Sequence, residues 1–153
     1  MNVEILFIIL LSLAPGIEAR GAFPLAYVLG YQGFSIFLLI FLSSTLPSIP
    51  IIYGLGWLEE KIVNRVSWIN KIYVAIIARI RRRAKQVTRY RIVYLGLILY
   101  VAIPSPGTGV WTGSLISYLL GLDKTRSVIA VAIGNFIACT IIYLTIYSVT
   151  ILL

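Results

Sequence analysis

Proline and glycine interrupt the apolar stretches of this chain at about half the length that a membrane-spanning helix needs. The first stretch, Ile5 to Ala14, ends at Pro15-Gly16, a pair that terminates helices. A helix needs about 20 apolar residues to cross the hydrocarbon core of a bilayer. The following stretch, Gly21 to Leu58, is too long for one crossing and is divided by a flexible turn at residues 30–33. The sequence therefore predicts half-length helices at 5–14 and 21–30, then one full crossing at 35–58 that Pro47 and Pro50 bend.

The second half of the chain repeats this order. Ile92 to Ile103 is half-length and ends at a run rich in proline and glycine, Val110 to Leu120 is again half-length, and Ser127 to Thr150 is long enough for one crossing. When Pro15–Gly30 is placed on Pro106–Gly121, 5 of 16 positions are identical. We therefore expect two repeats, residues 1–58 and 92–153, each with a hairpin (3–30 and 92–121) and one transmembrane helix (35–58 and 127–150).

Two half-length helices joined by a helix-breaking turn indicate a re-entrant hairpin, which reaches about the middle of the bilayer and returns to its starting side. Each repeat then crosses the membrane once, so the two repeats have opposite orientations. The predicted fold class is an all-α integral membrane protein built as an inverted repeat of a re-entrant helical hairpin plus a transmembrane helix. A signal peptide is the alternative for the first segment, but that segment lacks a basic start and has a counterpart later in the chain.

Basic residues gather between the two repeats. Ten of the 13 Lys and Arg lie between Lys61 and Arg91, a window without Asp or Glu. Apolar residues recur there at steps of three and four, which predicts a basic amphipathic helix at 59–91. The positive-inside rule places this segment in the cytoplasm and both termini outside, in the inner or plasma membrane. The segment serves as a topology anchor or attracts anionic lipids or an anionic substrate, and no nucleic-acid partner is expected.

The composition narrows the possible chemistry. The chain is 60% hydrophobic, has no His, and has a single cysteine, Cys139. These counts exclude a disulfide within one chain and a His/Cys metal cluster. Five acidic residues remain for any catalysis. We therefore expect neither an enzyme, nor a cofactor, nor a metal site.

The turn of the first hairpin carries the only charges predicted deep in the membrane, Glu18 and Arg20. Burying a charge there is costly, so such residues are functional candidates, and a structural ion pair is the alternative. The second helix of each hairpin begins near the midplane, where free N–H groups favour an anion such as phosphate. A poorly solvated Glu18 could also carry a proton. The candidate substrate-binding residues are Pro15, Gly16, Glu18, Arg20, Gly21, Ser105, Pro106, Gly107, Thr108 and Gly109.

The run Pro15–Pro24, together with Pro104–Gly109 in the second half, resembles the small multidrug export protein family, a distant relative of the DedA/VTT membrane protein superfamily. The resemblance covers nearly the whole chain. It implies two re-entrant hairpins, each followed by a transmembrane helix, and it implies functional roles for Glu18 and Arg20. Relatives in that superfamily are implicated in moving lipids across bilayers and in proton-dependent resistance. The second hairpin departs from the DedA pattern because its turn is uncharged.

These observations lead to three functional hypotheses. The first is a small transporter or flippase for an anionic amphiphile, such as polyprenyl phosphate or a phospholipid, coupled to protons. The second is export of small cationic or amphipathic compounds, with Glu18 as the binding charge. The third is a membrane scaffold or assembly factor that uses the basic segment. Anionic membrane lipids are the expected partners, and a homodimer would enlarge so small a bundle.

Overall fold

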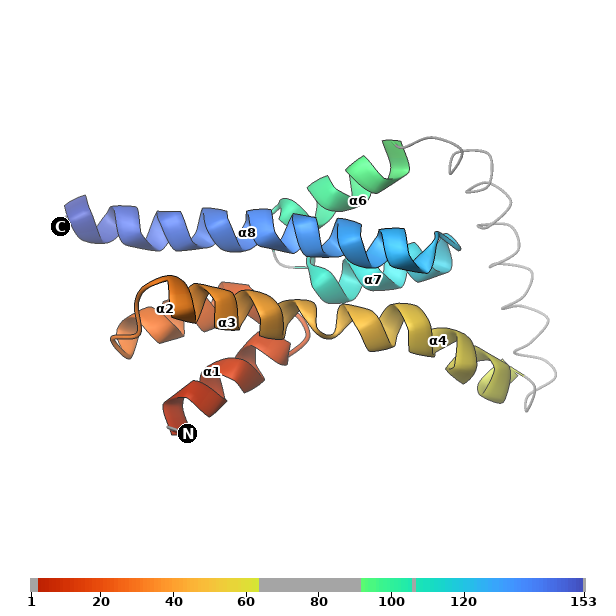
Figure 1. Cartoon of the computed structure of the whole chain (residues 1–153), viewed down its shortest axis with the longest axis horizontal. Coiled ribbons are helices and arrows are strands. Elements are labelled where there is room, and N and C mark those ends of the chain that lie inside the picture. The colour runs from red at the N-terminus through yellow and green to blue at the C-terminus, as the bar shows by residue number, and fades with distance from the viewer. Residues whose placement is uncertain (1–2, 64–91, 106, 153) are drawn as a thin grey trace.

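The computed structural model describes residues 3–63, 92–105 and 107–152, and every regular element in these ranges is an α-helix. The all-helical fold is therefore confirmed for this part of the chain. The predicted basic helix at 59–91 lies outside the described residues beyond Val63. Figure 1 shows the helices in chain order: α1 (Val3–Leu13), α2 (Glu18–Val28), α3 (Phe34–Thr45), α4 (Ser48–Val63), α6 (Ile92–Ala102), α7 (Val110–Leu119) and α8 (Lys124–Leu152).

Two short hairpins, α1–α2 and α6–α7, meet tip to tip near the centre of the molecule (Figure 1). Each of their helices has 10 or 11 residues. α2 begins at Glu18, earlier than the predicted Gly21. The predicted start of this helix was too late because Glu18 and Arg20, which are charged, were assigned to the turn. In the structure the partners of both charged side chains come from the other hairpin, so these residues can belong to the helix.

The helices α2 and α7 end in the same hydrogen-bond pattern. Each closes with a glycine in the left-handed region, Gly30 at φ 79° and Gly121 at φ 65°. Because glycine has no Cβ, it adopts this conformation at little cost and terminates the helix. At each helix end, three successive backbone N–H groups donate to carbonyl oxygens of the last turn, and these three bonds correspond one to one between the hairpins. With the donor named first, they are Leu29–Leu25, Gly30–Tyr27 and Tyr31–Ala26 in the first hairpin, and Leu120–Ile116, Gly121–Tyr118 and Leu122–Ser117 in the second.

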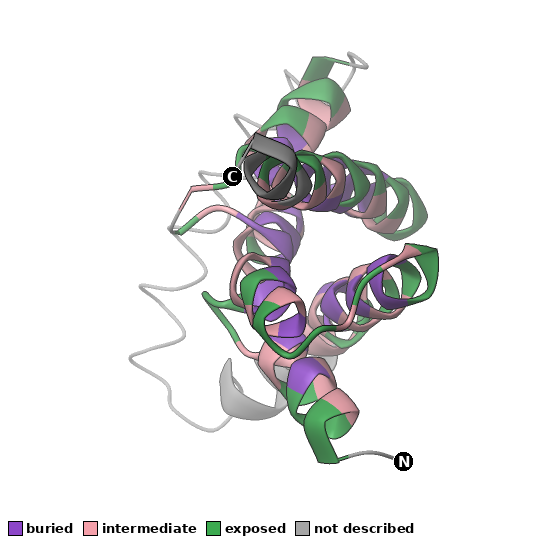
Figure 2. Ribbon diagram, turned by 90° about the vertical axis from the view of Figure 1, so that its left-hand side faces the viewer, coloured by how far each residue is buried: buried purple, intermediate pink, exposed green. Residues whose placement is uncertain are grey.

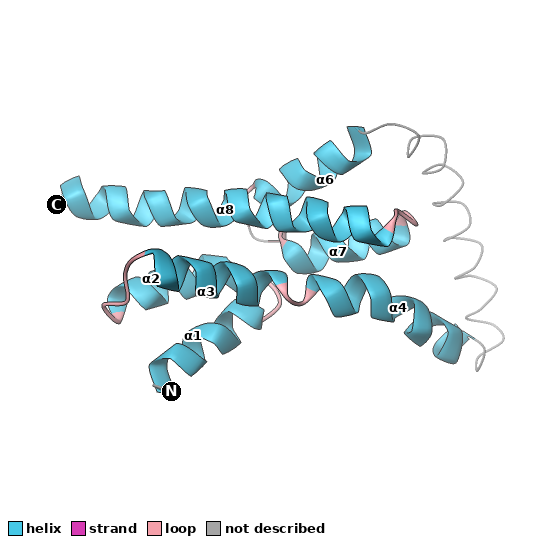
Figure 3. Cartoon of the chain, in the orientation of Figure 1, coloured by secondary structure: helices cyan, strands magenta, loops and turns pink. Residues whose placement is uncertain are grey.

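Among the described residues, two segments are long and apolar enough to cross a membrane, Phe34–Gly56 and Lys124–Ile146, each of 23 residues. The second belongs to the uninterrupted helix α8. The first is broken into α3 and α4 by a turn at Leu46 and Pro47 (Figure 3). Proline has no N–H with which to continue the helical ladder. The segment expected as one bent helix is therefore two helices in line.

The break between α3 and α4 lies beside a buried polar side chain of α8. The amide nitrogen of Asn135 donates to Ser44 Oγ and Thr45 Oγ1, both at 2.8 Å. Asn135 is 3% exposed and Ser44 is fully buried. Buried amide and hydroxyl groups are costly unless they are bonded. These bonds therefore fix the last turn of α3 against the middle of α8.

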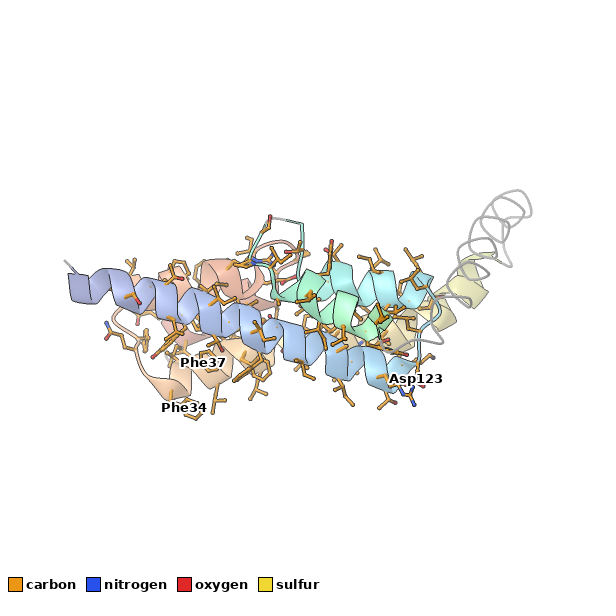
Figure 4. All side chains as sticks on the ribbon, turned by 90° about the horizontal axis from the view of Figure 1, so that it is seen from above. Phe34, Phe37 and Asp123 are labelled. Atoms are coloured by element: carbon orange, nitrogen blue, oxygen red, sulfur yellow. The ribbon has the colours of Figure 1, made fainter. Side chains whose placement is uncertain are left out.

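In the described part of the chain, the core consists of two clusters, one for each hairpin. The first joins α1, α2 and α3 to α8, and the second joins α6 and α7 to the start of α8. Figure 2 shows the buried residues where these helices face one another. In the first cluster the Phe37 ring, labelled in Figure 4, lies 5.8 Å from Phe23, 5.7 Å from Phe136 and 5.4 Å from Tyr143 between ring centroids. This aromatic contact holds α2 against α3 and α8.

In the second cluster, α6 and α8 approach so closely at Gly134 that no side chain fits. A Cβ at Gly134 would lie 2.7 Å from the Ile98 carbonyl oxygen and 2.8 Å from Val101 Cβ. We expect Gly134→Ala to lower the free energy of unfolding by about 1–3 kcal/mol because it forces α6 away from α8. The midpoint of thermal unfolding in detergent measures the effect.

Gly96 on α6 offers the matched control, since a Cβ there meets nothing within 4 Å. Alanine is favoured over glycine in helices by about 1 kcal/mol. Gly96→Ala should therefore leave the midpoint unchanged or raise it. Equal midpoints for the two variants would contradict the close approach at Gly134.

Candidate functional site

The Glu18 side chain lies at the contact between the two hairpin tips. The carboxylate accepts hydrogen bonds from the backbone N–H groups of Val110 and Trp111, both at 3.2 Å. These are the first two residues of α7. The first N–H groups of a helix have no partner within the helix and carry partial positive charge. Glu18, which is 3% exposed, therefore caps a helix of the opposite hairpin with a negative charge.

The carboxylate reaches α7 because the backbone has an uncommon conformation at two residues, one on each side of the contact. Glu18 itself has a φ of 50°, a left-handed conformation that is uncommon for residues other than glycine. Opposite it, Gly109 has a φ of 131°, and a Cβ there would overlap the Glu18 carboxylate. Such strain is found where the surrounding structure imposes it, and it clusters at functional sites. Gly109 therefore leaves the space that the carboxylate occupies.

Arg20 makes the complementary contact with the other end of the same turn. Its guanidinium donates to the carbonyl oxygen of Thr108, to Thr108 Oγ1 at 2.8 Å and to the Ile103 carbonyl oxygen at 3.1 Å. Ile103 directly follows the last residue of α6. The carbonyl groups at the end of a helix carry partial negative charge. Both charges at the tip of the first hairpin, Glu18 and Arg20, thus lie at the helix end of opposite sign in the second hairpin.

Trp111 holds the tips together in the reverse direction. Its indole Nε1 donates to the carbonyl oxygen of Leu13 at 3.1 Å, and Leu13 is the last residue of α1. Trp111 is not among the site residues predicted from the sequence. The alignment that places Pro15 on Pro106 also places Arg20 on Trp111. That correspondence is the signal that could have identified Trp111, since both residues donate to the end of the opposing half-length helix.

The other predicted residues shape the two turns. Thr108 Oγ1 lies 2.6 Å from the Ile103 carbonyl oxygen and 2.8 Å from that of Ser105. Gly107 is exposed, and its carbonyl oxygen accepts from the Tyr100 hydroxyl at 3.0 Å. Pro106 lies outside the described residues. On the first hairpin Pro15 and Gly16 are exposed, and Gly21 is half-buried, so the structure brings together Glu18, Arg20, Thr108 and Gly109.

An apolar pocket adjoins this contact between α4 and α7. It has a volume of about 280 Å³ and is lined by Ile51, Leu55, Trp111, Thr112 and Leu115. Trp111 connects the hairpin contact to the pocket, because its backbone N–H donates to Glu18 and Trp111 also lines the pocket. A charged group and an apolar space are therefore adjacent. Within the described ranges, no group of three or more His, Cys, Asp and Glu side chains that could hold a metal ion is found.

Two apolar segments of membrane-spanning length and two short hairpins joined through the buried Glu18 carboxylate define an all-helical membrane protein within the described residues. The family described as "Putative small multi-drug export protein" matches residues 18–141, and the chain belongs to this family. The match begins at Glu18, the residue that caps α7. The family description indicates a transporter rather than an enzyme. No curated protein and no solved structure matches the chain.

Proposed function

We propose that the protein transports amphipathic compounds with an anionic headgroup, such as lipid phosphates, and that Glu18 and Arg20 at the hairpin tips form its substrate site. The observation that carries this proposal is the position of the Glu18 carboxylate on the N–H groups of α7. An anion already occupies this helix end, so its geometry suits a carboxylate or phosphate oxygen. A substrate anion that displaces Glu18 would find the same two donors.

Protons would couple to transport through the same exchange. While Glu18 is ionised, its carboxylate competes with the substrate for α7. A protonated Glu18 is a weaker acceptor and gives up the N–H groups more readily. Proton uptake and anion binding would then favour each other. The apolar pocket beside Trp111 supports an amphipathic substrate, because it offers space for the apolar part next to the charged part.

Export of small cationic compounds is the second candidate, and the family description favours it. Glu18 is a buried negative charge beside an apolar pocket, which is the chemistry that an amphipathic cation needs. In this case Arg20 would keep the tip of the second hairpin in place and would not touch the substrate. A scaffold that acts through the basic segment is the third candidate, and residues 64–91 lie outside the described part of the chain.

We also propose that both hairpins are re-entrant and that the two halves form an inverted repeat. A helix of 11 residues is about 16 Å long, half of a hydrocarbon core of about 30 Å. The matched caps of α2 and α7 support the repeat. If the placement of Pro15 on Pro106 is continued beyond Gly30 without a gap, Ser44 falls on Asn135. Two contacts between residues paired in this way also support the repeat, Glu18 with Gly109 and Ser44 with Asn135. In a two-fold arrangement, a residue that touches its own counterpart lies near the axis.

The remaining expectations follow from this topology. The charge distribution places the basic segment in the cytoplasm and both termini outside, in the inner or plasma membrane. The discontinuous helices at the membrane centre are typical of secondary transporters. They are also what a distant relation to the DedA/VTT superfamily would imply. A homodimer remains part of the proposal because the bundle is small.

Cysteine labelling tests the topology. Glu4 on α1 and Gln32 after α2 are both exposed. With Cys139 replaced by serine, single cysteines at these two positions should react with a membrane-impermeant maleimide added to the outside of intact cells. Labelling of the two positions from opposite sides would mean that the first hairpin crosses the membrane, and the proposed site would be lost with it.

Reconstitution in liposomes tests the substrate. A fluorescent lipid phosphate and a fluorescent lipophilic cation are offered to the wild-type protein and to Arg20→Ala. Under the anion proposal, the wild type moves the lipid phosphate and Arg20→Ala moves it at least about tenfold more slowly. Movement of the cation alone, little affected by Arg20→Ala, would favour the second candidate. Movement of neither compound by the wild type would contradict both candidates for these two probes.

A further inference from the structure

A second groove opens between α6 and α8, away from the hairpin tips. Its volume is about 520 Å³, and it is lined by Tyr94, Leu95 and Ile98 of α6 and by Arg126, Ile129, Ala130 and Ile133 of α8. Tyr94 and Arg126 lie in the first turns of their helices, whereas the tip of this hairpin follows the last turn of α6. The groove therefore extends from the start of α8 towards the tip and is separate from the site of Glu18.

Most of the groove is aliphatic and open to the surroundings. Leu95 is 56% exposed, Ile129 is 54% exposed and Ile133 is 45% exposed. Between Arg126 and Ile133 the helix rises about 10 Å. Because α8 is long and apolar enough to span a membrane, these side chains would face lipid chains. The shape and chemistry of this part suit a segment of an acyl chain.

The end of the groove at the start of α8 is basic. Arg126 is exposed, and no hydrogen bond or ion pair of its guanidinium is found within residues 3–63, 92–105 and 107–152. The nearby Asp123, labelled in Figure 4, caps α8 by accepting from the backbone N–H of Arg126 at 2.9 Å. Its own N–H bonds to the Tyr94 hydroxyl at 3.2 Å. Lys124 points elsewhere, with its Nζ 5.4 Å from the centre of the Tyr53 ring on α4.

We propose that this groove binds one anionic phospholipid of the surrounding leaflet, with the lipid phosphate on the Arg126 guanidinium and an acyl chain along Leu95, Ile129 and Ile133. Charge complementarity decides the occupant. A guanidinium binds phosphate through paired, charge-assisted hydrogen bonds. An apolar groove whose described lining ends in the Arg126 cation matches a lipid that has one anionic head and a long apolar chain. This site does not depend on the proposed function of the hairpin tips.

Native mass spectrometry of the full-length protein tests the site with phosphatidylglycerol and phosphatidylcholine at equal concentrations. The wild type should retain phosphatidylglycerol in preference to phosphatidylcholine. Arg126→Ala should lower the fraction with bound phosphatidylglycerol at least about tenfold. Lys124→Ala removes the same charge two residues away and should retain the lipid. Ile129→Trp keeps Arg126 but fills the groove, so it should also lower binding.

Three results would overturn the site. The first is equal retention of both lipids by the wild type, which removes the role of charge. The second is unchanged phosphatidylglycerol binding in Arg126→Ala. The third is an equal loss in Lys124→Ala and Arg126→Ala, which indicates diffuse attraction to a basic surface. Arg126→Ala leaves the hairpin tips intact and should move the fluorescent lipid phosphate across liposomes at the wild-type rate, so a failure at the hairpin tips can be told apart from a failure here.

Discussion

Replacement of Gly109 by alanine is expected to abolish transport and to destabilise the protein by about 2–5 kcal/mol. The new Cβ would lie 2.9 Å from the Glu18 carboxyl carbon and from one of its oxygens. Because the backbone at Gly109 has a φ of 131°, an alanine there is strained even before the overlap. Glu18 would have to leave the N–H groups of Val110 and Trp111. Thermal unfolding in detergent measures the loss of stability, and uptake in liposomes measures the loss of transport.

Gly107, in the same turn, separates backbone strain from overlap. Its φ of 87° also disfavours alanine, but a Cβ there meets nothing within 4 Å. Gly107→Ala should therefore cost only about 1–3 kcal/mol and should retain transport. Loss of transport in both variants to the same extent would show that the turn, and not the space for the carboxylate, is what transport requires.

Replacement of Glu18 by glutamine is expected to slow transport at least about tenfold with a smaller loss of stability, about 1–2 kcal/mol. Glutamine has nearly the same shape, and its amide oxygen can still accept one N–H of α7. It carries no negative charge for the α7 end, and it cannot exchange a proton. Transport by the variant should also lose its dependence on a proton gradient. The rate of lipid-phosphate movement, with and without such a gradient, checks both expectations.

Glu4→Gln is the matched control for this variant. Glu4 is exposed on α1, and its carboxylate accepts from the Tyr31 hydroxyl at 2.7 Å, remote from the hairpin tips. The variant removes the same charge from the first hairpin and should transport at the wild-type rate. A Glu18→Gln protein that keeps both its rate and its gradient dependence would refute the exchange of Glu18 with the substrate.

The helices could be predicted from the sequence because their breaks are local. Pro15 and Gly16 come one residue after the end of α1, and Gly30 ends α2 through its own left-handed backbone. Such signals act over a few residues and are read without knowledge of the fold. The break at Pro47 was read only as a bend. Whether a proline bends a helix or divides it depends on the neighbours, and here Asn135 of α8 holds the last turn of α3.

The partners of the site residues could not be predicted in the same way. Glu18 and Arg20 were identified as candidates because isolated charges in apolar surroundings are costly. Their contacts with Val110 and Thr108 join residues about 90 positions apart in the chain, and no local pattern encodes such pairing. Trp111 was missed because the candidates were chosen for charge, for backbone freedom or for a hydroxyl group in the turn. Its role depends on the indole N–H meeting a carbonyl group across the two tips.

The pairing of Glu18 with Gly109 limits how such a molecule can be assembled from its parts. In a symmetric dimer of one half-length chain, both positions would hold the same residue. Two glutamates would place like charges face to face, with no glycine to make room for either. Two glycines would leave the start of α7 without its acceptor. Joining both halves in one polypeptide lets the two positions differ, so a single carboxylate meets a single vacant space.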